Sequence, residues 1–311
     1  MSSLKATLTR ELDIPFDAPG ADKPCLTHVK VFGELTAGGK TPLVALHGGP
    51  GVSMDYILSL SDLSLPPFSI PVVFYDQIGN GHSTHLPEKR GDASFWTDAL
   101  FLAELDNVLK YLNIQDDYAL WGSSWGGMLA ARHALSQPKG LKKLVLASAP
   151  SSIARWLASA NALRRTLPPD VQAALDAGEE SRGYGSKEYQ AAMDVFFSSF
   201  GCRLKPLPEE VKESGRWVGR DDTVWMTMNG PSEFVNTGTL NEWSIIGELH
   251  AITTPTLVTN GAYDEAQDDV VRPFVDEIPG ATWVKFENSA HMAHFEERER
   301  YMQVIGEFLL K

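Results

Sequence analysis

The sequence predicts an α/β fold with a mostly parallel central sheet flanked by helices, and three observations support this prediction. Short apolar runs alternate with segments whose apolar residues recur at helical spacing. Several of these runs end in glycine-bearing loops, as expected at the carboxyl ends of parallel strands. Between residues 150 and 249 the strand-like runs stop, and helical patterns broken by Pro and Gly replace them. We therefore expect a core of residues 1–149 and 250–311, with a helical cap inserted at residues 150–249.

The composition excludes several classes of protein. With 43% apolar and 22% charged residues in 311, the chain is long enough for one large core with an insertion. The formal net charge of −13 disfavours nucleic acid and anionic membranes as partners, because both require basic surfaces. No apolar segment resembles a secretory signal or a membrane span, so we expect a cytoplasmic protein. Cys25 and Cys202 are expected as free thiols, because two cysteines make no disulfide framework.

Segments in the first part of the chain predict the first strands of the sheet. Strand-like residues between 7 and 35, interrupted by the turn-rich stretch 16–20, predict an entry hairpin. The apolar runs 42–46 and 72–75 are short enough to be buried strands, and each ends in a loop with several glycines. Such loops allow the backbone to approach a ligand closely.

Helices and strands then alternate. Leucines at helical spacing predict a helix over 95–112. The apolar runs 118–121 and 144–147 predict two further strands, with a helix at 125–135 between them. This order favours right-handed crossovers and a parallel sheet.

The expected cap has its own helical pattern, clearest at 169–177 and 187–200. It contains more large apolar side chains than short helices need for their own packing, so some of them are expected to line a pocket. These side chains are Trp156, Phe196, Phe197, Trp217, Trp225, Phe234 and Trp243.

The last part of the chain returns to the alternation. Strands are predicted at 255–259 and 281–286, with a helix at 269–277 between them. A closing helix at 299–310 has its apolar residues on one face.

A short motif after the strand at 118–121 indicates catalysis. Gly122, Ser124 and Gly126 form the pattern G-x-S-x-G between a predicted strand and a predicted helix. A strand that turns sharply into a helix forces the corner residue into a strained conformation and needs small neighbours. Ser124 is therefore the candidate nucleophile. The backbone N–H of Trp125, at a helix N-terminus, is a candidate donor to a developing negative charge.

A serine nucleophile needs a histidine to accept its proton and an acid to orient that histidine. In hydrolases with this motif the order along the chain is Ser, Asp or Glu, then His. Asp264 follows a predicted strand and His291 follows the last one, so we assign the triad to Ser124, Asp264 and His291. A second oxyanion donor is expected in the loop 47–51, where we choose the backbone N–H of Gly49.

Each assignment has a rival. His294 lies three residues beyond His291 but closer to the final helix. Asp268 and Asp269 are expected in the first turn of the next helix, where acidic residues are common. Asp76 also ends a strand, but it precedes the serine and is expected to order its own loop. The remaining histidines precede Asp264 and are expected in packing or loop hydrogen bonds. No metal-binding or phosphate-binding motif is present, so we expect neither a metal nor another cofactor.

Read together, several motifs resemble those of the proline iminopeptidases, which are prolyl aminopeptidases of the α/β-hydrolase fold, and of related amino-acid amidases. The shared stretches are His-Gly-Gly-Pro-Gly at 47–51, Asp-Gln-Ile-Gly-Asn-Gly-His-Ser at 76–83, the serine motif, Tyr-Asp-Glu at 263–265 and His-Met at 291–292. The resemblance covers most of the chain, and it implies a helical cap inserted after the sixth strand of the core.

The resemblance also implies a substrate with a free amino terminus, often proline, whose ammonium group is anchored by acidic side chains. By motif, Glu265 and Glu233 are similar to those anchors. The alternatives are a carboxylate at a helix start for Glu265 and a solvated loop charge for Glu233. His82 departs from the family pattern, since many members carry Arg there, and this departure leaves the fine substrate preference open.

Three functions follow as hypotheses. The first is a serine hydrolase that releases an N-terminal proline or another small apolar residue from peptides or amino-acid amides. The second is a carboxylesterase of broad specificity that uses the same triad. The third is a non-catalytic ligand receptor on the same fold, which the complete triad disfavours.

Overall fold

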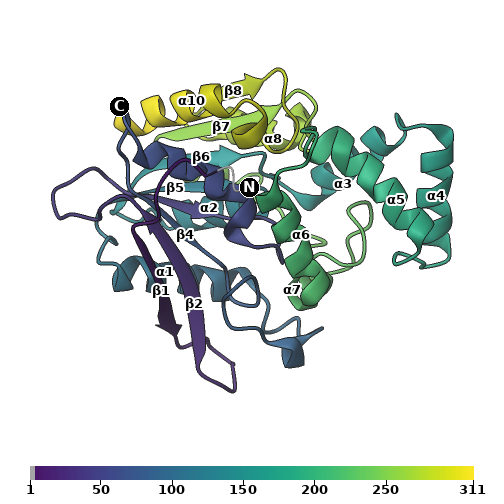
Figure 1. Cartoon of the computed structure of the whole chain (residues 1–311), viewed down its shortest axis with the longest axis horizontal. Helices are drawn as coiled ribbons and strands as arrows, with labels where there is room; N and C mark the ends of the chain where they lie inside the picture. The colour runs from purple at the N-terminus through teal and green to yellow at the C-terminus, as the bar shows by residue number, and fades with distance from the viewer. Residues whose placement is uncertain (1–3) are drawn as a thin grey trace.

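The computed structural model describes residues 4–311 and contains one eight-stranded sheet in the order β1-β2-β4-β3-β5-β6-β7-β8 (Figure 1). The first two strands form an antiparallel hairpin, β2 also runs antiparallel to β4, and the other neighbours are parallel. The mostly parallel sheet and the entry hairpin are therefore confirmed. The strands are β1 Arg10–Phe16, β2 Cys25–Phe32, β3 Leu43–Leu46, β4 Val72–Tyr75, β5 Tyr118–Ser123, β6 Leu141–Ala147, β7 Thr256–Gly261 and β8 Thr282–Phe286.

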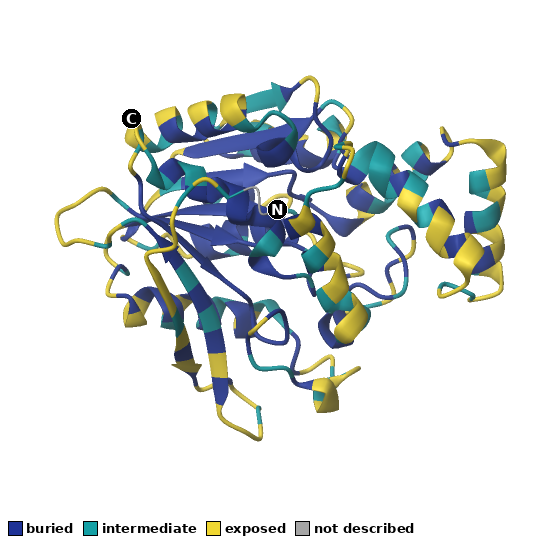
Figure 2. Ribbon diagram, in the orientation of Figure 1, coloured by how far each residue is buried: buried dark blue, intermediate teal, exposed yellow. Residues whose placement is uncertain are grey.

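Helices cover both faces of the sheet because successive side chains of each strand point to opposite faces. In β3, Val44 and Leu46 pack in one apolar cluster, whereas Leu43 and Ala45 pack in the other. Figure 2 shows the strands at the centre of the sheet as buried. One face is covered by α1 (Asp98–Tyr111), α2 (Trp125–Leu135) and α8 (Asp268–Glu277), and the other by α10 (Arg298–Leu310) and the 3₁₀ segment η1 (Met54–Ser64).

Two boundaries and one element illustrate how the structure differs from the prediction. The helix expected from residue 95 begins at Asp98, because the Thr97 side chain caps it by accepting a hydrogen bond from the N–H of Leu100. Strand β6 begins at Leu141, three residues before the expected start at 144. The 3₁₀ segment η1 was not predicted from the apolar pattern. It begins after Ser53, whose side chain accepts from the N–H of Asp55.

The insertion between β6 and β7 is helical, with α3, α4 and α5 on the right of Figure 1 and α6 and α7 nearer its centre. Residues 187–200 were predicted as one helix, but α5 ends at Phe196 and continues as a π-helical turn over Phe197–Gly201. The division into a core and a cap with the expected bounds stays a prediction. The helices of the insertion are α3 Ile153–Arg164, α4 Pro169–Glu180, α5 Lys187–Phe196, α6 Glu209–Arg220 and α7 Thr223–Met228.

Two further observations bear on the cellular setting expected from the sequence. Cys25 and Cys202 are both buried free thiols. Within residues 4–311, none of the helices combines the length and the apolar character needed to cross a bilayer. The cytoplasmic location stays a prediction.

Candidate active site

Ser124 occupies the sharp turn between β5 and α2 with backbone angles φ 54° and ψ −121°. A residue with a Cβ atom rarely adopts this conformation, which costs about 1–3 kcal/mol. The two flanking glycines make the turn possible. A Cβ atom on Gly122 would lie 2.2 Å from the carbonyl oxygen of Gly126, and one on Gly126 would lie 2.2 Å from that of Leu46. The local sequence therefore forces Ser124 outward above the sheet.

His291 and Asp264 lie in the loops that follow the two last strands of the sheet, and their side chains meet. The imidazole Nδ1 lies 2.7 Å from Asp264 Oδ1. The carboxylate, which is fully buried, also accepts hydrogen bonds from the backbone N–H groups of Ala266 and Gly261. This arrangement holds a proton on Nδ1 and leaves Nε2 free to accept one.

The rival residues make other contacts. Asp268 pairs with Lys285 at 2.9 Å. Asp76 accepts from the backbone N–H groups of Met54 and His82, and so orders its own loop. His294 is buried with its Nδ1 2.9 Å from Ser59 Oγ, and burial lowers its pKa to about 3.

One backbone group that the sequence did not indicate joins the loop of Asp264 and Glu265 to the loop of His291. The carbonyl oxygen of Phe200, in the π-helical turn after α5, accepts hydrogen bonds from the backbone N–H groups of both Glu265 and His291. A π-helical turn of this kind is common at functional sites. No sequence pattern could reveal it, because any residue supplies the same carbonyl.

The loop between β3 and η1 approaches Ser124 from the other side. Gly49 has a φ of +106°, and a Cβ atom there would lie 2.5 Å from the N atom of Gly51. The N–H of the preceding Gly48 donates to the Tyr56 hydroxyl at 2.7 Å. Tyr56 was not singled out from the sequence, because η1 was not predicted.

A cavity of about 170 Å³ brings the predicted site residues together. Asp264 lies behind His291 and does not line the cavity. Of the large apolar side chains noted in the insertion, Trp156, Phe197 and Trp225 line the cavity, whereas Phe196 and Phe234 pack in a separate cluster. The predicted residues that line the cavity are Ser124, Trp125, Gly49, His291, Glu265 and Glu233.

The ionisable side chains in this cavity influence one another. Burial raises the pKa of Glu265 to about 8, the positive charge of His291 opposes this shift, and Glu233 and Asp264 add to it. Burial likewise raises the pKa of Glu233 to about 7, opposed by His291 and by a hydrogen bond from Trp156. Two carboxylates held in an apolar cavity form a site that favours a bound cation.

The same cluster acts on His291. Burial alone would lower its pKa, but the charge and hydrogen bond of Asp264 and the charges of Glu265 and Glu233 outweigh burial and raise the pKa to about 9. Glu265 Oε1 lies 3.8 Å from the same Nδ1 atom that binds Asp264. The acidic residues therefore favour the imidazolium form of His291 while the cavity holds no cation.

The segment that carries Glu233 is fixed by the helices of the insertion. The guanidinium carbon of Arg164 lies 4.6 Å from the ring centre of Phe234, and Asn161 Nδ2 donates to the carbonyl oxygen of Phe234. The Tyr189 hydroxyl donates to Ser232 Oγ at 3.0 Å. Glu233 is therefore held between anchored neighbours instead of lying in a free loop.

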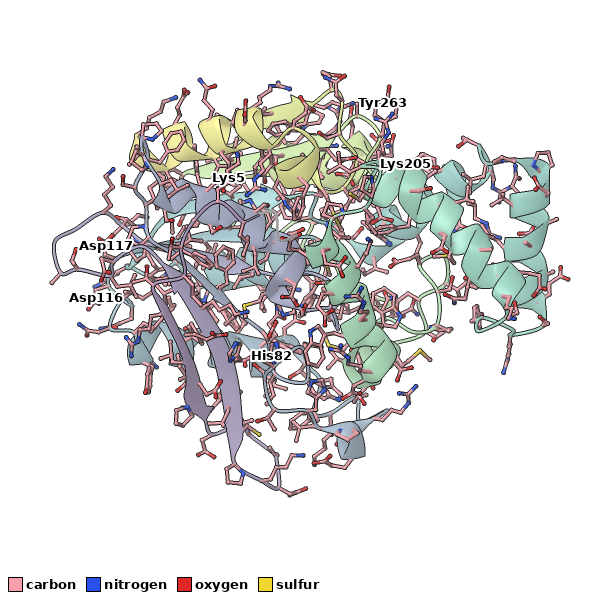
Figure 3. The ribbon with its side chains drawn as sticks, in the orientation of Figure 1. Lys5, His82, Asp116, Asp117, Lys205 and Tyr263 are labelled. Carbon is pink, nitrogen blue, oxygen red and sulfur yellow. The ribbon has the colours of Figure 1, made fainter. Side chains whose placement is uncertain are left out.

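Two motif residues of the sequence analysis lie apart from this chemistry. His82 packs against His28 and Trp217, with ring centres 5.1 and 4.9 Å away, and Figure 3 shows it near β2. His82 therefore lies outside the cavity lining. Tyr263 is 45% exposed, with the guanidinium of Arg203 stacked on its ring. Within residues 4–311, no cluster of His, Cys, Asp or Glu has the arrangement of a metal site.

Comparison with known proteins gives the family. The family model for the α/β hydrolase fold matches residues 41–298. The chain is 38% identical to the proline iminopeptidase of Saccharolobus solfataricus, over 88% of this chain and 86% of the relative. It is 37% identical to that of Heyndrickxia coagulans, over 88% of this chain and 91% of the relative.

Two solved structures are similar to nearly the whole chain, and one of them is a proline iminopeptidase. The crystal structure of VinJ is 44% identical and has a TM-score of 0.92, covering 97% of this chain and 99% of that chain. The proline iminopeptidase of Mycobacterium smegmatis is 37% identical with a TM-score of 0.87, covering 96% of this chain and 97% of that chain. The chain therefore belongs to the proline iminopeptidase family of α/β hydrolases.

Proposed function

We propose that this protein is a serine aminopeptidase that releases an N-terminal proline, or another small apolar residue, from peptides or amino-acid amides. The observation that carries the proposal is the shared cavity. Ser124 and His291 line it together with Glu233 and Glu265, so an acyl-transfer nucleophile lies beside a site for a cation. Relatives named proline iminopeptidase support the same activity.

Acylation begins when Ser124 Oγ attacks the carbonyl carbon of the N-terminal residue and His291 Nε2 accepts the hydroxyl proton. Asp264 holds the opposite ring nitrogen and stabilises the imidazolium that forms. The oxyanion is stabilised by the backbone N–H groups of Gly49 and Trp125, each such donor contributing about 3 kcal/mol to the transition state.

The second half of the reaction returns the enzyme to its starting state. His291 passes its proton to the leaving amine nitrogen, the scissile C–N bond breaks, and the N-terminal residue remains as an ester of Ser124. Water then attacks this ester, and His291 accepts a proton from the attacking water. Collapse of the second tetrahedral intermediate releases the free amino acid and restores the serine hydroxyl.

Glu233 and Glu265 explain why a free amine is required in this proposal. The α-ammonium group of the substrate forms charge-assisted hydrogen bonds with them, each contributing about 1.5–3 kcal/mol. An N-acetylated substrate carries no charge there and would leave both carboxylates of the cavity without a cation. This proposal includes the division of the chain into a core and an inserted cap. It also includes the assignment of Ser124, His291 and Asp264 as the catalytic triad.

The direct test is turnover of a prolyl anilide by the wild-type protein and by Ser124→Ala. We expect the variant to lose nearly all activity, and we expect a fluorophosphonate probe to label the wild-type protein only. Near-normal turnover by the variant would refute the mechanism. Failure of the probe to react with Ser124 would instead support a receptor on the same fold.

A carboxylesterase that uses the same triad is the second candidate. The apolar side chains of the cavity wall, among them Val52, Val211 and Met292, favour it because they suit an uncharged ester. The two candidates differ in their need for the amine. An esterase accepts acylated and deaminated substrates as readily as those with a free amino terminus.

A further inference from the structure

Gln77 connects the two loops that carry the candidate oxyanion donors. Its side-chain Nε2 donates to the carbonyl oxygen of His47 at 2.8 Å. Its Oε1 accepts from the indole Nε1 of Trp125 at 2.9 Å. The amide is fully buried and thus bridges the loop before η1 and the start of α2.

The orientation of this amide is fixed by its partners. The indole N–H only donates and the backbone carbonyl only accepts, so a flipped amide would place donor against donor and acceptor against acceptor. Both hydrogen bonds would be lost, and buried polar groups without partners are costly. An apolar side chain of the same length would leave both partners unsatisfied.

A further contact extends this bridge to the Gly48–Gly49 peptide. The backbone N–H of Gln77 donates to His47 Nε2 at 2.9 Å, so the remaining proton of the neutral ring is on Nδ1. Nδ1 lies 3.0 Å from the carbonyl oxygen of Gly48 and donates to it. Burial supports the neutral ring, since it lowers the pKa of His47 to about 4.

This contact sets the direction of the second donor. The C=O of Gly48 and the N–H of Gly49 belong to one trans peptide and point in opposite directions. Since His47 holds the carbonyl, the N–H of Gly49 points away from His47, and Gly49 lines the cavity.

We propose that Gln77 is a positioning residue that sets the separation and direction of the two oxyanion donors, the N–H groups of Gly49 and Trp125. Its side chain holds the Trp125 indole and the His47 carbonyl, and its backbone fixes the His47 tautomer that orients the Gly48–Gly49 peptide. This inference rests on the proposed function, because the oxyanion donors belong to that proposal. It assigns a catalytic consequence to the second residue of the Asp76–Ser83 motif.

The test compares wild type with Gln77→Met, which preserves length and removes both side-chain hydrogen bonds, and with Gln77→Glu, which keeps the acceptor for the indole. We expect kcat for a prolyl anilide to fall about 10- to 100-fold in Gln77→Met, because displaced donors lose much of their stabilisation. We expect KM to change little. We expect kcat of Gln77→Glu to lie between those of the wild type and Gln77→Met. The matched control is Tyr75→Phe, which removes a buried hydroxyl that has no hydrogen-bond partner within residues 4–311.

A second readout separates positioning from a general loss of structure. A boronic acid analogue of proline forms a tetrahedral adduct on Ser124 whose oxygen occupies the oxyanion site. We expect Gln77→Met to weaken this inhibitor about as much as it lowers kcat, while prolinol, which has the ring amine but no carbonyl for Ser124 to attack, binds as before. Should Gln77→Met be too unstable, the same comparison with Gln77→Glu decides the question.

The outcomes distinguish this inference from the function on which it rests. Unchanged kcat and unchanged boronate affinity in a folded Gln77 variant would overturn the inference, even with Ser124→Ala inactive. Equal losses in boronate and prolinol binding would also overturn it, since they indicate a disturbed cavity. An active Ser124→Ala would refute the proposed function itself.

Discussion

Nδ1 of His291 lies between two carboxylates, 2.7 Å from Asp264 Oδ1 and 3.8 Å from Glu265 Oε1. The neighbours Asp264 and Glu265 thus act on one ring from different distances. In the proposed mechanism Asp264 orients the histidine, whereas Glu265 faces the cavity and binds the substrate's amine. This division of roles leads to separate predictions for the two residues.

Asp264→Asn should reduce kcat by about 10³- to 10⁴-fold, because an amide side chain no longer stabilises the imidazolium or holds the proton on Nδ1. Steady-state kinetics on a prolyl anilide measures this loss. The control is Asp269→Asn, an exposed residue in the first turn of α8. A loss smaller than tenfold for Asp264→Asn would contradict the assigned triad.

Glu265→Gln should act mainly on recognition of the amine. We expect kcat/KM for a free prolyl anilide to fall at least about tenfold, because a neutral amide replaces one charge-assisted hydrogen bond. The control is Glu287→Gln, which makes the same change in charge at an exposed residue in the loop of His291. If both variants lost activity equally, the loss would reflect a general electrostatic effect and not a specific contact between Glu265 and the substrate's amine.

The pH dependence follows from the raised pKa of His291. Ser124 reacts only when His291 is unprotonated, so labelling by an uncharged fluorophosphonate should speed up as the pH rises towards about 9. Glu265→Gln removes a charge that favours the imidazolium, so the midpoint of this rise should move to lower pH. A midpoint that stayed in place, or moved to higher pH, would show that Glu265 does not act on His291.

The strained backbone of Ser124 predicts an effect on stability. Ser124→Gly should have a free energy of unfolding about 1 kcal/mol higher than Ser124→Ala, because glycine adopts this conformation without strain, and that gain exceeds its entropic cost. Urea denaturation of the two inactive variants measures the difference. A less stable glycine variant would mean that the turn is not strained.

The sequence predicted the sheet well because its strands are short apolar runs that end at glycines. The strand at 72–75 matches β4 residue for residue, and the helix at 125–135 matches α2. Segment η1 escaped prediction because it is buried on most sides, with Ser59 and Ser61 buried beside Ile57 and Leu58, so its apolar residues do not mark a single helix face. The break in α5 at Phe196 also leaves no mark in the apolar pattern.

Candidate site residues with a distinctive side chain were found from the sequence, since Ser124, Asp264 and His291 each follow a predicted strand. The backbone donors Gly49 and Trp125 were proposed because they lie within recognisable motifs, whereas groups that act through long-range contacts were not indicated. The Phe200 carbonyl joins Glu265 to His291, and the Gln77 amide joins His47 to Trp125, only after the chain has folded. Local sequence patterns carry no information about such pairs.

The central claim is that Ser124 acts on substrates whose free amine is held by Glu233 and Glu265. The measurement that tests it most directly is kcat/KM of the wild-type protein for a prolyl anilide and for its N-acetyl derivative. The account predicts that acetylation lowers kcat/KM at least about 100-fold, the scale set by losing two charge-assisted hydrogen bonds. Equal kcat/KM for the two substrates would contradict it and favour an esterase or amidase that ignores the amine.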